Sequence, residues 1–326
     1  MRQKGEWKAG ENSMITLTDE QIEKEYHMHH AIADVKNVLQ DLKDDAIIQA
    51  PRTVLPVDDN SSMLYMPCIS TASKISIIKT VSIFPVNKDL PTTQGNLLVT
   101  DLTKGEHKAT MDASYLTRLR TGGMTAIATE RLARKDAKTI GAIGTGNMAF
   151  EQVLGVVEVR DIERIVLYNR TKEKAEAFKE RLEAFGIKAD IKVVDNASEV
   201  VTQSDILNCA TQSTEPVFDG NDLKPGAHIN GVGSFKPVMK EMDETTIKRA
   251  NQIYADDLES VKEEAGELIH AVDAGISWDD IKGELVDIFE QDYLKQDDAE
   301  ITLYKCVGAG YFDLAVAGGV MKMFAE

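Results

Sequence analysis

The sequence has little that would suit a secreted, membrane-bound or metal-binding protein. Its three cysteines, Cys68, Cys209 and Cys306, lie far apart without a CxxC pair, which is typical of reduced thiols in the cytoplasm. No apolar run approaches the roughly 20 residues that cross a bilayer, and residues 1–13 lack the apolar core of a signal peptide. The six histidines show no metal-ligand spacing. We therefore expect a cytoplasmic protein without a metal, in which residues 1–13 form a disordered extension.

Positive charge is also scarce, because 37 Lys and Arg residues face 54 Asp and Glu residues and the formal net charge is -17. Such a chain repels phosphate backbones and anionic lipid, which argues against nucleic acid and membranes as partners. An anionic ligand then needs a local basic pocket. Three cations lie in otherwise neutral segments: Arg52 in APRTVL, Lys79 in ISIIKTVSIFP and Arg120 in LTRLRTGG. Lys79 is costly in an apolar strand unless it is paired or faces a ligand, and arginine binds carboxylates bidentately, so these residues predict an anion site.

The 326 residues suffice for two domains, and the local patterns change along the chain. Residues 16–43 predict a helix with Thr18 as its N-cap. Residues 52–101 contain short β-branched runs divided by turn residues, which predicts a mostly antiparallel sheet. Residues 114–134 predict a long helix interrupted at Gly122 and Gly123. From residue 138 strands and helices alternate, which favours a parallel sheet, and residues 301–326 predict a long apolar helix that packs on the first domain or on a second subunit.

A dinucleotide-binding fingerprint follows the apolar strand TIGAI. Gly144, Gly146 and Ala149 form the pattern G-x-G-x-x-A, and a helix and a second strand, RIVLYN, come next. The first glycine permits a tight turn, the second lets a pyrophosphate approach the backbone, and the alanine lets the helix pack on the strand. The helix N-terminus offers free N–H groups to the phosphates. The combination predicts a bound nicotinamide dinucleotide.

The end of the second strand predicts which dinucleotide is bound. An NAD site usually has Asp or Glu there, but this chain has Asn169, Arg170 and Thr171. These side chains can bind a 2′-phosphate, and the arginine can pair with it. We therefore expect NADP(H) in preference to NAD(H), although NAD(H) stays possible.

Several further segments resemble the ornithine cyclodeaminase/mu-crystallin family in their order along the chain. Besides the fingerprint they are PRT at 51–53, KTVSIFPVN at 79–87, LPTTQGNLLVTDLTKGE at 90–106, YLTRLRTGG at 115–123, YNRTKEKAEAF at 168–178, LKPGAHINGVGSFKP at 223–237 and CVGAGYFDLAVA at 306–317. The resemblance implies an α/β fold, in which a Rossmann doubly wound parallel sheet (119–304) is inserted into a second, discontinuous α+β domain (14–118 plus 305–326). That second domain would bind the substrate and form a homodimer.

The resemblance also implies roles for single residues. Arg52, Lys79 and Arg120 match positions that hold the substrate carboxylate, and Lys79 would be catalytic because it lies near the reacting centre. The predicted cofactor contacts come from several segments, and some of them match cofactor-contacting positions of the family. They are Thr93, Arg120, Thr121, Gly144, Gly146, Asn147, Met148, Asn169, Arg170, Thr171, Thr211 and Cys306, the last of which is Ser in many relatives.

One departure from the family pattern bears on the reaction. Ornithine cyclodeaminases carry an Asp where this chain has Phe235, in GVGSFKP. Phenylalanine cannot accept a proton or pair with an ammonium, which favours the ketimine reductases, enzymes that reduce small cyclic imino acids such as pyrroline-2-carboxylate or piperideine-2-carboxylate. The alternatives are an ornithine cyclodeaminase, an alanine-dehydrogenase-like enzyme, an enzyme that joins two amino acids and a non-catalytic NADPH-dependent ligand-binding protein.

Overall fold

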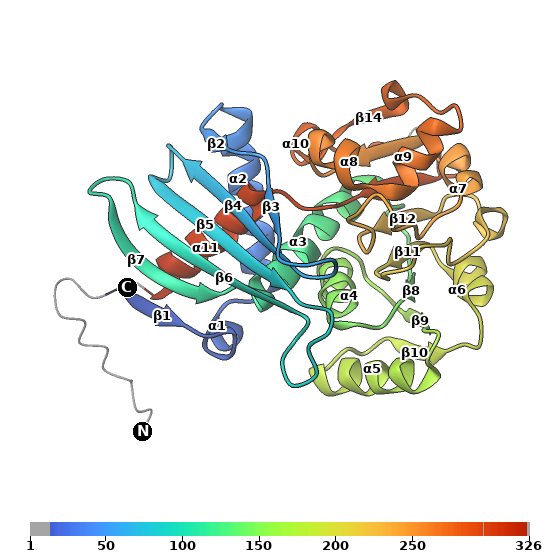
Figure 1. Ribbon diagram of the computed structural model, residues 1–326. Helices are drawn as coiled ribbons and strands as arrows, with labels where there is room; N and C mark the ends of the chain where they lie inside the picture. The colour runs from blue at the N-terminus through green and yellow to red at the C-terminus, as the bar shows by residue number, and fades with distance from the viewer. Residues whose placement is uncertain (1–13, 296, 325–326) are drawn as a thin grey trace.

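The structure, a computed structural model, describes residues 14–295 and 297–324; the predicted extension at 1–13 lies outside the described residues. Its first sheet has the strand order β1-β7-β6-β5-β4-β2, with β3 also paired to β4 (Figure 1). Every pair in it is antiparallel except β1–β7, which confirms the predicted antiparallel sheet. The strands are β1 (Ile15–Leu17), β2 (Ile47–Gln49), β3 (Thr53–Pro56), β4 (Ser62–Ser70), β5 (Ile75–Ile83), β6 (Thr93–Asp101) and β7 (Glu106–Asp112).

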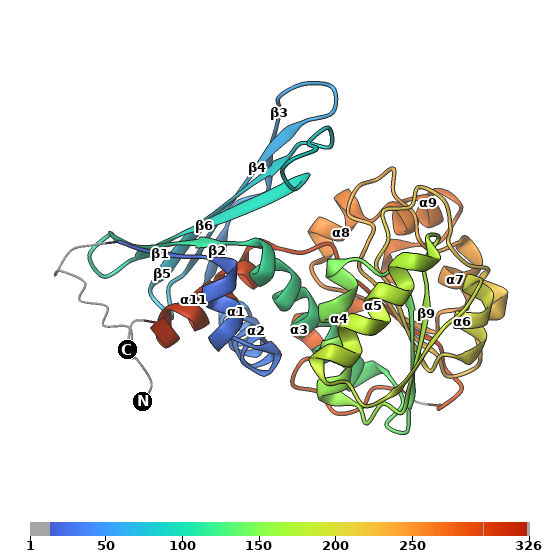
Figure 2. The same ribbon diagram turned by 90° about the horizontal axis from the view of Figure 1, so that it is seen from below.

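Three helices lie on one face of this sheet, as Figure 2 shows: α1 (Asp19–Glu25), α2 (Met28–Lys43) and α11 (Gly310–Phe324). The predicted single helix over 16–43 is therefore wrong. Its N-cap is confirmed, since the Thr18 side chain accepts the Gln21 N–H, but the chain is extended at Tyr26 and His27. Tyr26 is buried there and donates a hydrogen bond to Asp34 at 2.7 Å, a tertiary contact that outweighs helix continuity.

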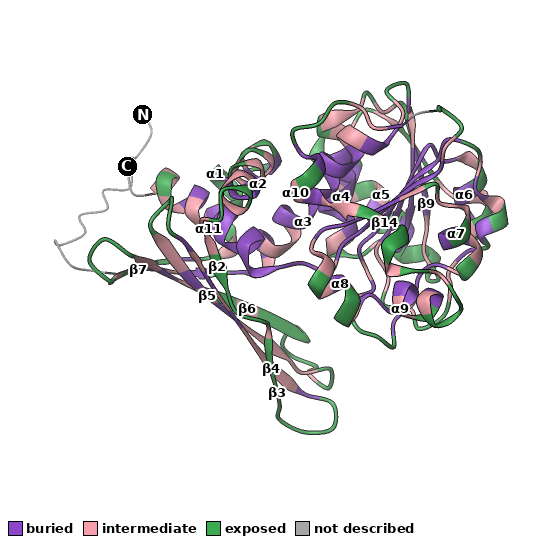
Figure 3. Ribbon diagram, turned by 90° about the horizontal axis from the view of Figure 1, so that it is seen from above, coloured by how far each residue is buried: buried purple, intermediate pink, exposed green. Residues whose placement is uncertain are grey.

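The long helix α3 (Ser114–Leu132) runs without a break through Gly122 and Gly123, so the predicted interruption is wrong. The reason is packing against α4 (Asn147–Val159). A Cβ on Gly122 would collide with the carbonyl of Glu151 and approach Met28 Cε to 2.6 Å, while a Cβ on Gly155 would meet the Gly122 carbonyl. These glycines let two helices cross closely at the buried junction of the molecule (Figure 3).

The second sheet has eight strands, all parallel, in the order β10-β9-β8-β11-β12-β15-β13-β14. This confirms the predicted α/β fold with a Rossmann-like parallel sheet. Its strands are β8 (Thr139–Ile143), β9 (Arg164–Tyr168), β10 (Asp190–Val193), β11 (Ile206–Cys209), β12 (His228–Gly231), β13 (Gln252–Ala255), β14 (Ile281–Glu284) and β15 (Thr302–Lys305). Besides α4, its α-helices are α5 (Lys172–Phe185), α6 (Ala197–Gln203), α7 (Glu244–Arg249), α8 (Leu258–Glu264), α9 (Gly266–Asp273) and α10 (Leu285–Ile288).

The prediction of one long helix for the C-terminal segment is wrong. Its first part is β15, which enters the second sheet between β12 and β13. A left-handed turn at Gly308, with φ of +89°, then leads into α11, which packs against α2, β4 and β5 of the first sheet layer. No helix in the described part of the chain is both long and apolar enough to span a membrane.

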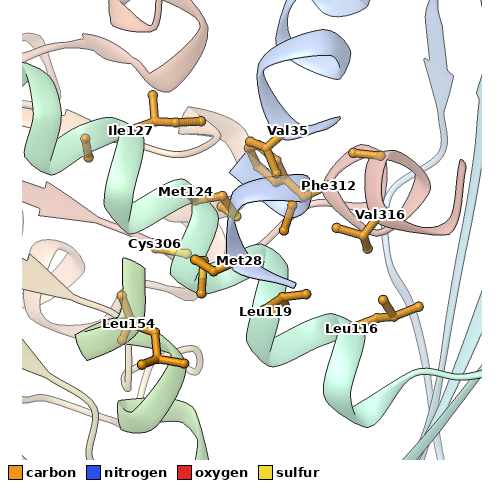
Figure 4. Close-up of a cluster of buried hydrophobic side chains, with 14 of the residues drawn as sticks. Met28, Val35, Leu116, Leu119, Met124, Ile127, Leu154, Cys306, Phe312 and Val316 are labelled. Carbon is orange, nitrogen blue, oxygen red and sulfur yellow. The ribbon is translucent and has the colours of Figure 1, made fainter. Parts of the chain in front are cut away.

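The larger of two hydrophobic clusters continues across both halves (Figure 4), and the other lies within the parallel-sheet half. Side chains of α2, α3, α4 and α11 meet in the larger cluster, together with Cys306 at the end of β15. The proposed domain boundaries at 118/119 and 304/305 fall inside α3 and β15, and the division at those residues stays a proposal.

The helix crossing predicts opposite effects for two neighbouring substitutions in α3. Gly122→Ala should lower the free energy of unfolding by about 1–3 kcal/mol, because the new methyl group has no room. Gly123→Ala is the matched control: its Cβ would lie 3.4 Å from the backbone of Ala31, and alanine favours a helix by roughly 0.5–1 kcal/mol. Urea unfolding measures both, and equal effects of the two substitutions would contradict the close crossing.

Candidate active site

The three predicted cations lie close together where the sheet layer, α3 and α11 meet. Lys79 on β5 is only 4% exposed. Its Nζ donates to Asp313 Oδ1 at 2.8 Å and to Thr117 Oγ1 at 2.7 Å. The Nε of Arg120, on α3, contacts the same Asp313 oxygen at 3.3 Å. One buried carboxylate thus joins Lys79 and Arg120.

Asp313 was not among the residues predicted from the sequence. The signal that could have found it is a carboxylate in the apolar segment GYFDLAVA, the counterpart of a lysine in an apolar strand. Burial raises the pKa of Asp313, but the charges of Lys79 and Arg120 outweigh this and bring it below its usual value. Asp313 is therefore ionised, and its second oxygen, Oδ2, has no hydrogen-bond partner within the described part of the protein.

Lys79 has an electrostatic environment suited to proton transfer. Burial lowers its pKa to about 8; the charges of Arg120 and Arg52 also lower it, and Asp313 opposes them. A general acid works best when its pKa lies near the working pH. Lys79 can therefore give up and regain a proton under ordinary conditions.

Arg52 reaches the same region from the loop before β3. Its Nη1 donates to Glu264 Oε2 on α8 at 2.7 Å and its Nη2 donates to the Gly308 carbonyl at 3.0 Å. Burial raises the pKa of Glu264 to about 7, against the opposing effect of Arg52. In these ion pairs Asp313 is shared by Lys79 and Arg120, and Glu264 pairs with Arg52.

The turn at Gly308 separates the two arginines. A Cβ on Gly308 would lie 2.7 Å from Arg120 Nη2, so a glycine is needed for this approach. Asp256, which follows β13, fixes the turn by accepting the N–H groups of Val307 at 3.1 Å and Gly308 at 2.6 Å. Burial raises the pKa of Asp256, and the hydrogen bond from the Gly308 N–H acts against this.

A cleft of about 560 Å³ follows the carboxyl ends of β8, β9 and β11. It is lined by residues 143–146, 168–171 and 210–213 together with Lys174 and Val217. Gly144 has φ of +89° and its Cβ would lie 2.6 Å from the Ala210 carbonyl, as a tight turn requires. A Cβ on Gly146 would enter open space at the start of α4. The residues present therefore fit a dinucleotide pyrophosphate, which would bind at the N–H groups of this helix end.

The predicted cofactor residues divide into two sets. Those that line the cleft are Gly144, Gly146, Asn169, Arg170, Thr171 and Thr211, and Lys174 joins them without having been predicted. The others lie outside its lining. Asn147 begins α4, Met148 packs on the core, Thr93 is exposed at the start of β6, Thr121 is buried in α3 with Arg120, and Cys306 is buried at the end of β15. The roles of both sets stay predictions.

Cys306 has surroundings that limit its chemistry. It lies among hydrophobic side chains, near Met28 and Met124 in Figure 4. Burial raises the pKa of its thiol well above the usual value, and the neighbouring Asp256 raises it further. A cysteine that stays protonated is a poor nucleophile, which argues against a nucleophilic role for Cys306.

A sequence model of the ornithine cyclodeaminase/mu-crystallin family matches residues 11–325. The chain belongs to this family. It is 36% identical over 310 residues to a delta(1)-pyrroline-2-carboxylate reductase of Bacillus cereus, a match that covers 93% of this chain and 94% of that protein.

Solved structures agree with the family assignment. The structure of Thermococcus litoralis delta(1)-pyrroline-2-carboxylate reductase in complex with NADH and L-proline is 33% identical, with a TM-score of 0.90 over 96% of this chain and 98% of that one. An archaeal alanine dehydrogenase dimer with bound NAD is 28% identical, with a TM-score of 0.88 over 95% of each chain. The chain is an oxidoreductase that uses a nicotinamide nucleotide.

The Arg52–Glu264 pair predicts a measurable titration. Arg52→Met should raise the pKa of Glu264 above about 7, since burial still disfavours its charge and the arginine no longer stabilises it. Arg52→Lys keeps the charge and should move the pKa less. Carboxyl ¹³C NMR, with the signal assigned by its loss in Glu264→Gln, measures this. An unchanged pKa in Arg52→Met would show that the two side chains do not pair in solution.

Proposed function

We propose that this protein is an NAD(P)H-dependent reductase of small cyclic imino acids, of the pyrroline-2-carboxylate or piperideine-2-carboxylate type. The observation behind the proposal is the buried cluster of Lys79, Arg120 and Asp313, with Arg52 nearby, in a chain that also has a dinucleotide cleft. The relatives named pyrroline-2-carboxylate reductase support the choice of substrate.

The substrate carboxylate would bind to Arg52 and Arg120. Both guanidinium groups are held by other contacts, Arg52 by Glu264 and Gly308 and Arg120 by Asp313. A clamp that is already ordered loses little entropy when the ligand binds, and orientation of this kind contributes several kcal/mol to catalysis.

Lys79 would act on the imine nitrogen. A reduced nicotinamide, when bound, supplies the hydride that a C=N bond needs. Protonation of the nitrogen makes the adjacent carbon more electrophilic, and Lys79 holds a transferable proton because its pKa is about 8. After the transfer the neutral Lys79 side chain would keep its hydrogen bonds to Thr117 and Asp313 until it regains a proton.

The rival reactions make different demands on the same residues. A cyclodeaminase needs a carboxylate at Phe235, whose half-buried ring instead lies 5.9 Å below the Lys236 ammonium. An alanine dehydrogenase could use the same cations, and its similar fold makes it the principal alternative. A non-catalytic binding protein has no need for a buried lysine with a lowered pKa.

The proposal is tested by following NADPH and NADH oxidation with pyrroline-2-carboxylate, with piperideine-2-carboxylate and with pyruvate plus ammonia. We expect rapid oxidation with a cyclic imine alone. The value of kcat/KM for the imine should fall as the pH rises through about 8, because Lys79 of the free enzyme then loses the proton it donates.

Lys79→Met is the matched variant for that assay. It removes the ammonium, and we expect kcat to fall at least about 100-fold, the usual contribution of a general acid, while cofactor binding stays within about twofold because the cleft is lined by other residues. Activity that requires ammonia would favour the dehydrogenase. Ammonia release from ornithine without net cofactor oxidation would favour the cyclodeaminase. Near-normal turnover in Lys79→Met would exclude the role of Lys79.

We also propose NADP(H) as the preferred cofactor. The cleft is lined by Asn169, Arg170 and Thr171, none of which carries a carboxylate that would repel a 2′-phosphate, and Lys174 adds a second cation to its lining.

We further propose that the protein is cytoplasmic and forms a homodimer. Exposed apolar side chains along the β2–β3 edge of the first sheet, Ile48, Val54, Leu55 and Val57, support burial against a second copy.

The cofactor proposal predicts that Arg170→Ala lowers kcat/KM for NADPH by about tenfold, the loss of one charged hydrogen-bonded contact, and leaves that for NADH nearly unchanged. Lys172→Ala is the control, because Lys172 begins α5 two residues after Arg170 but pairs with Asp195 at 2.6 Å and does not line the cleft. Steady-state kinetics with both cofactors provides the ratio, and an equal loss with NADPH and NADH would contradict the 2′-phosphate contact.

A further inference from the structure

A buried carboxylate lies behind the wall of the cofactor cleft. Glu241 belongs to the loop between β12 and α7 and is fully buried. It is not part of the cleft lining and does not belong to the Lys79 cluster. A charge buried away from water needs a structural or functional reason.

Among the described residues, the side-chain hydrogen bonds of Glu241 all come from the backbone of two strand-end loops. Its Oε1 accepts the N–H of Thr211, which follows β11, at 2.5 Å. Its Oε2 accepts the N–H groups of Gly233 at 2.8 Å and Ser234 at 3.2 Å, which follow β12. A Cβ on Gly233 would collide with the backbone of Thr211, so the two loops are in close contact around the carboxylate.

The backbone beside Glu241 holds the same wall at two more points. The Glu241 carbonyl accepts the N–H of Val217 at 2.9 Å, and the Ser213 carbonyl accepts the N–H of Lys240 at 2.8 Å. Thr211, Ser213 and Val217 all line the dinucleotide cleft. This part of the wall, residues 211–217, is thus attached to residues 240–241 along its length.

A buried cation at the end of the next strand completes the arrangement. Lys305, the last residue of β15, donates to the Ser234 carbonyl at 2.7 Å and pairs with Glu267 at 2.9 Å. Burial raises the pKa of Glu241 and the neighbouring Glu267 raises it further, while Lys305 and the Thr211 N–H act against this. Three N–H donors on two oxygens match an ionised carboxylate.

Such a cluster is weak evidence for stability alone. Apolar side chains of similar volume often stabilise a core as well as buried charges do. A carboxylate, unlike an apolar side chain, can accept three backbone N–H groups and fix their direction at the carboxyl edge of the sheet. This edge, beyond the fingerprint, is where a dinucleotide extends in folds of this class.

We infer that Glu241 is a positioning residue for the cofactor: it fixes the backbone of Thr211, Gly233 and Ser234 before the dinucleotide binds. The inference rests on the proposed function only in requiring that the cleft binds a nicotinamide dinucleotide. It does not depend on the imino acid substrate, on Lys79 or on the choice between NADPH and NADH.

Glu241→Gln tests the inference by binding rather than by activity. Glutamine has nearly the same shape, but its NH₂ group would face backbone N–H donors instead of accepting from them. We expect the Kd of NADPH and of NADH, measured by quenching of protein fluorescence, to rise about tenfold through loss of charged hydrogen bonds.

Glu267→Gln is the matched control. Glu267 lies in the same buried cluster and pairs with Lys305, but within the described residues it accepts no backbone N–H of either loop. We expect it to lower the Tm about as much as Glu241→Gln does while changing the Kd less than about twofold. Equal changes in Kd for the two variants would reduce Glu241 to a structural role and overturn the inference.

Hydrogen exchange of the unsubstituted protein is a second measurement that does not depend on a variant folding. The amides of Thr211, Gly233 and Ser234 should already be protected without NADPH, and in Glu241→Gln they should exchange faster than the β11 amides. Rapid exchange in the free unsubstituted protein, followed by protection only when NADPH is added, would show that the cofactor orders these loops and Glu241 does not. If imines are not reduced but NADPH binds, the proposed function fails and this inference is still tested.

Discussion

The ion pairs of Asp313 connect the parts of the chain that the site depends on. Its carboxylate, on the last helix, is shared by Lys79 on a central strand and Arg120 on the helix that joins the two halves. Buried charges lose their hydration, and only close partners compensate for that loss. Removing Asp313 would leave two cations buried together. The return of the chain through β15 to α11 is therefore a requirement of the site as well as a feature of the topology.

That return path explains why local sequence patterns found some site residues and missed others. The fingerprint glycines are close in sequence and each has a local job, so the turn at Gly144 and the helix start at Gly146 could be predicted from the sequence. Lys79 and Asp313 are 234 positions apart. An unpaired charge in an apolar run indicates that a partner exists, but nothing in its neighbours identifies the partner. Glu264 and Glu241 lie in charged segments, VKEEAGE and VMKEMDE, so no isolated charge singles them out, and their partners lie on other loops.

The errors in secondary structure have a related cause. The strand β15, with the sequence TLYK, is buried along its whole length, and a strand buried on both faces has no alternating pattern that would distinguish it from a helix. Gly122 was read as a local helix breaker, whereas its missing side chain makes room for α4. At Tyr26 a hydrogen bond to Asp34 outweighs a sequence that could continue as a helix. In each case a tertiary contact decides between local structures that the sequence allows.

The large negative charge of the chain is compatible with anionic ligands, because the surface charge and the cations of the site act over different distances. Exposed carboxylates are screened beyond about 10 Å at ordinary ionic strength. Lys79 and Arg120 lie in a region from which water is excluded, where a charge acts strongly on a close neighbour. Asp313 is shared by these two cations, whereas Arg52 has its own partner, Glu264. Because one carboxylate serves two cations, a ligand carboxylate that comes equally close would interact with them as strongly as Asp313 does. The acidic exterior, which acts only through screened, longer-range interactions, has little effect on that contact.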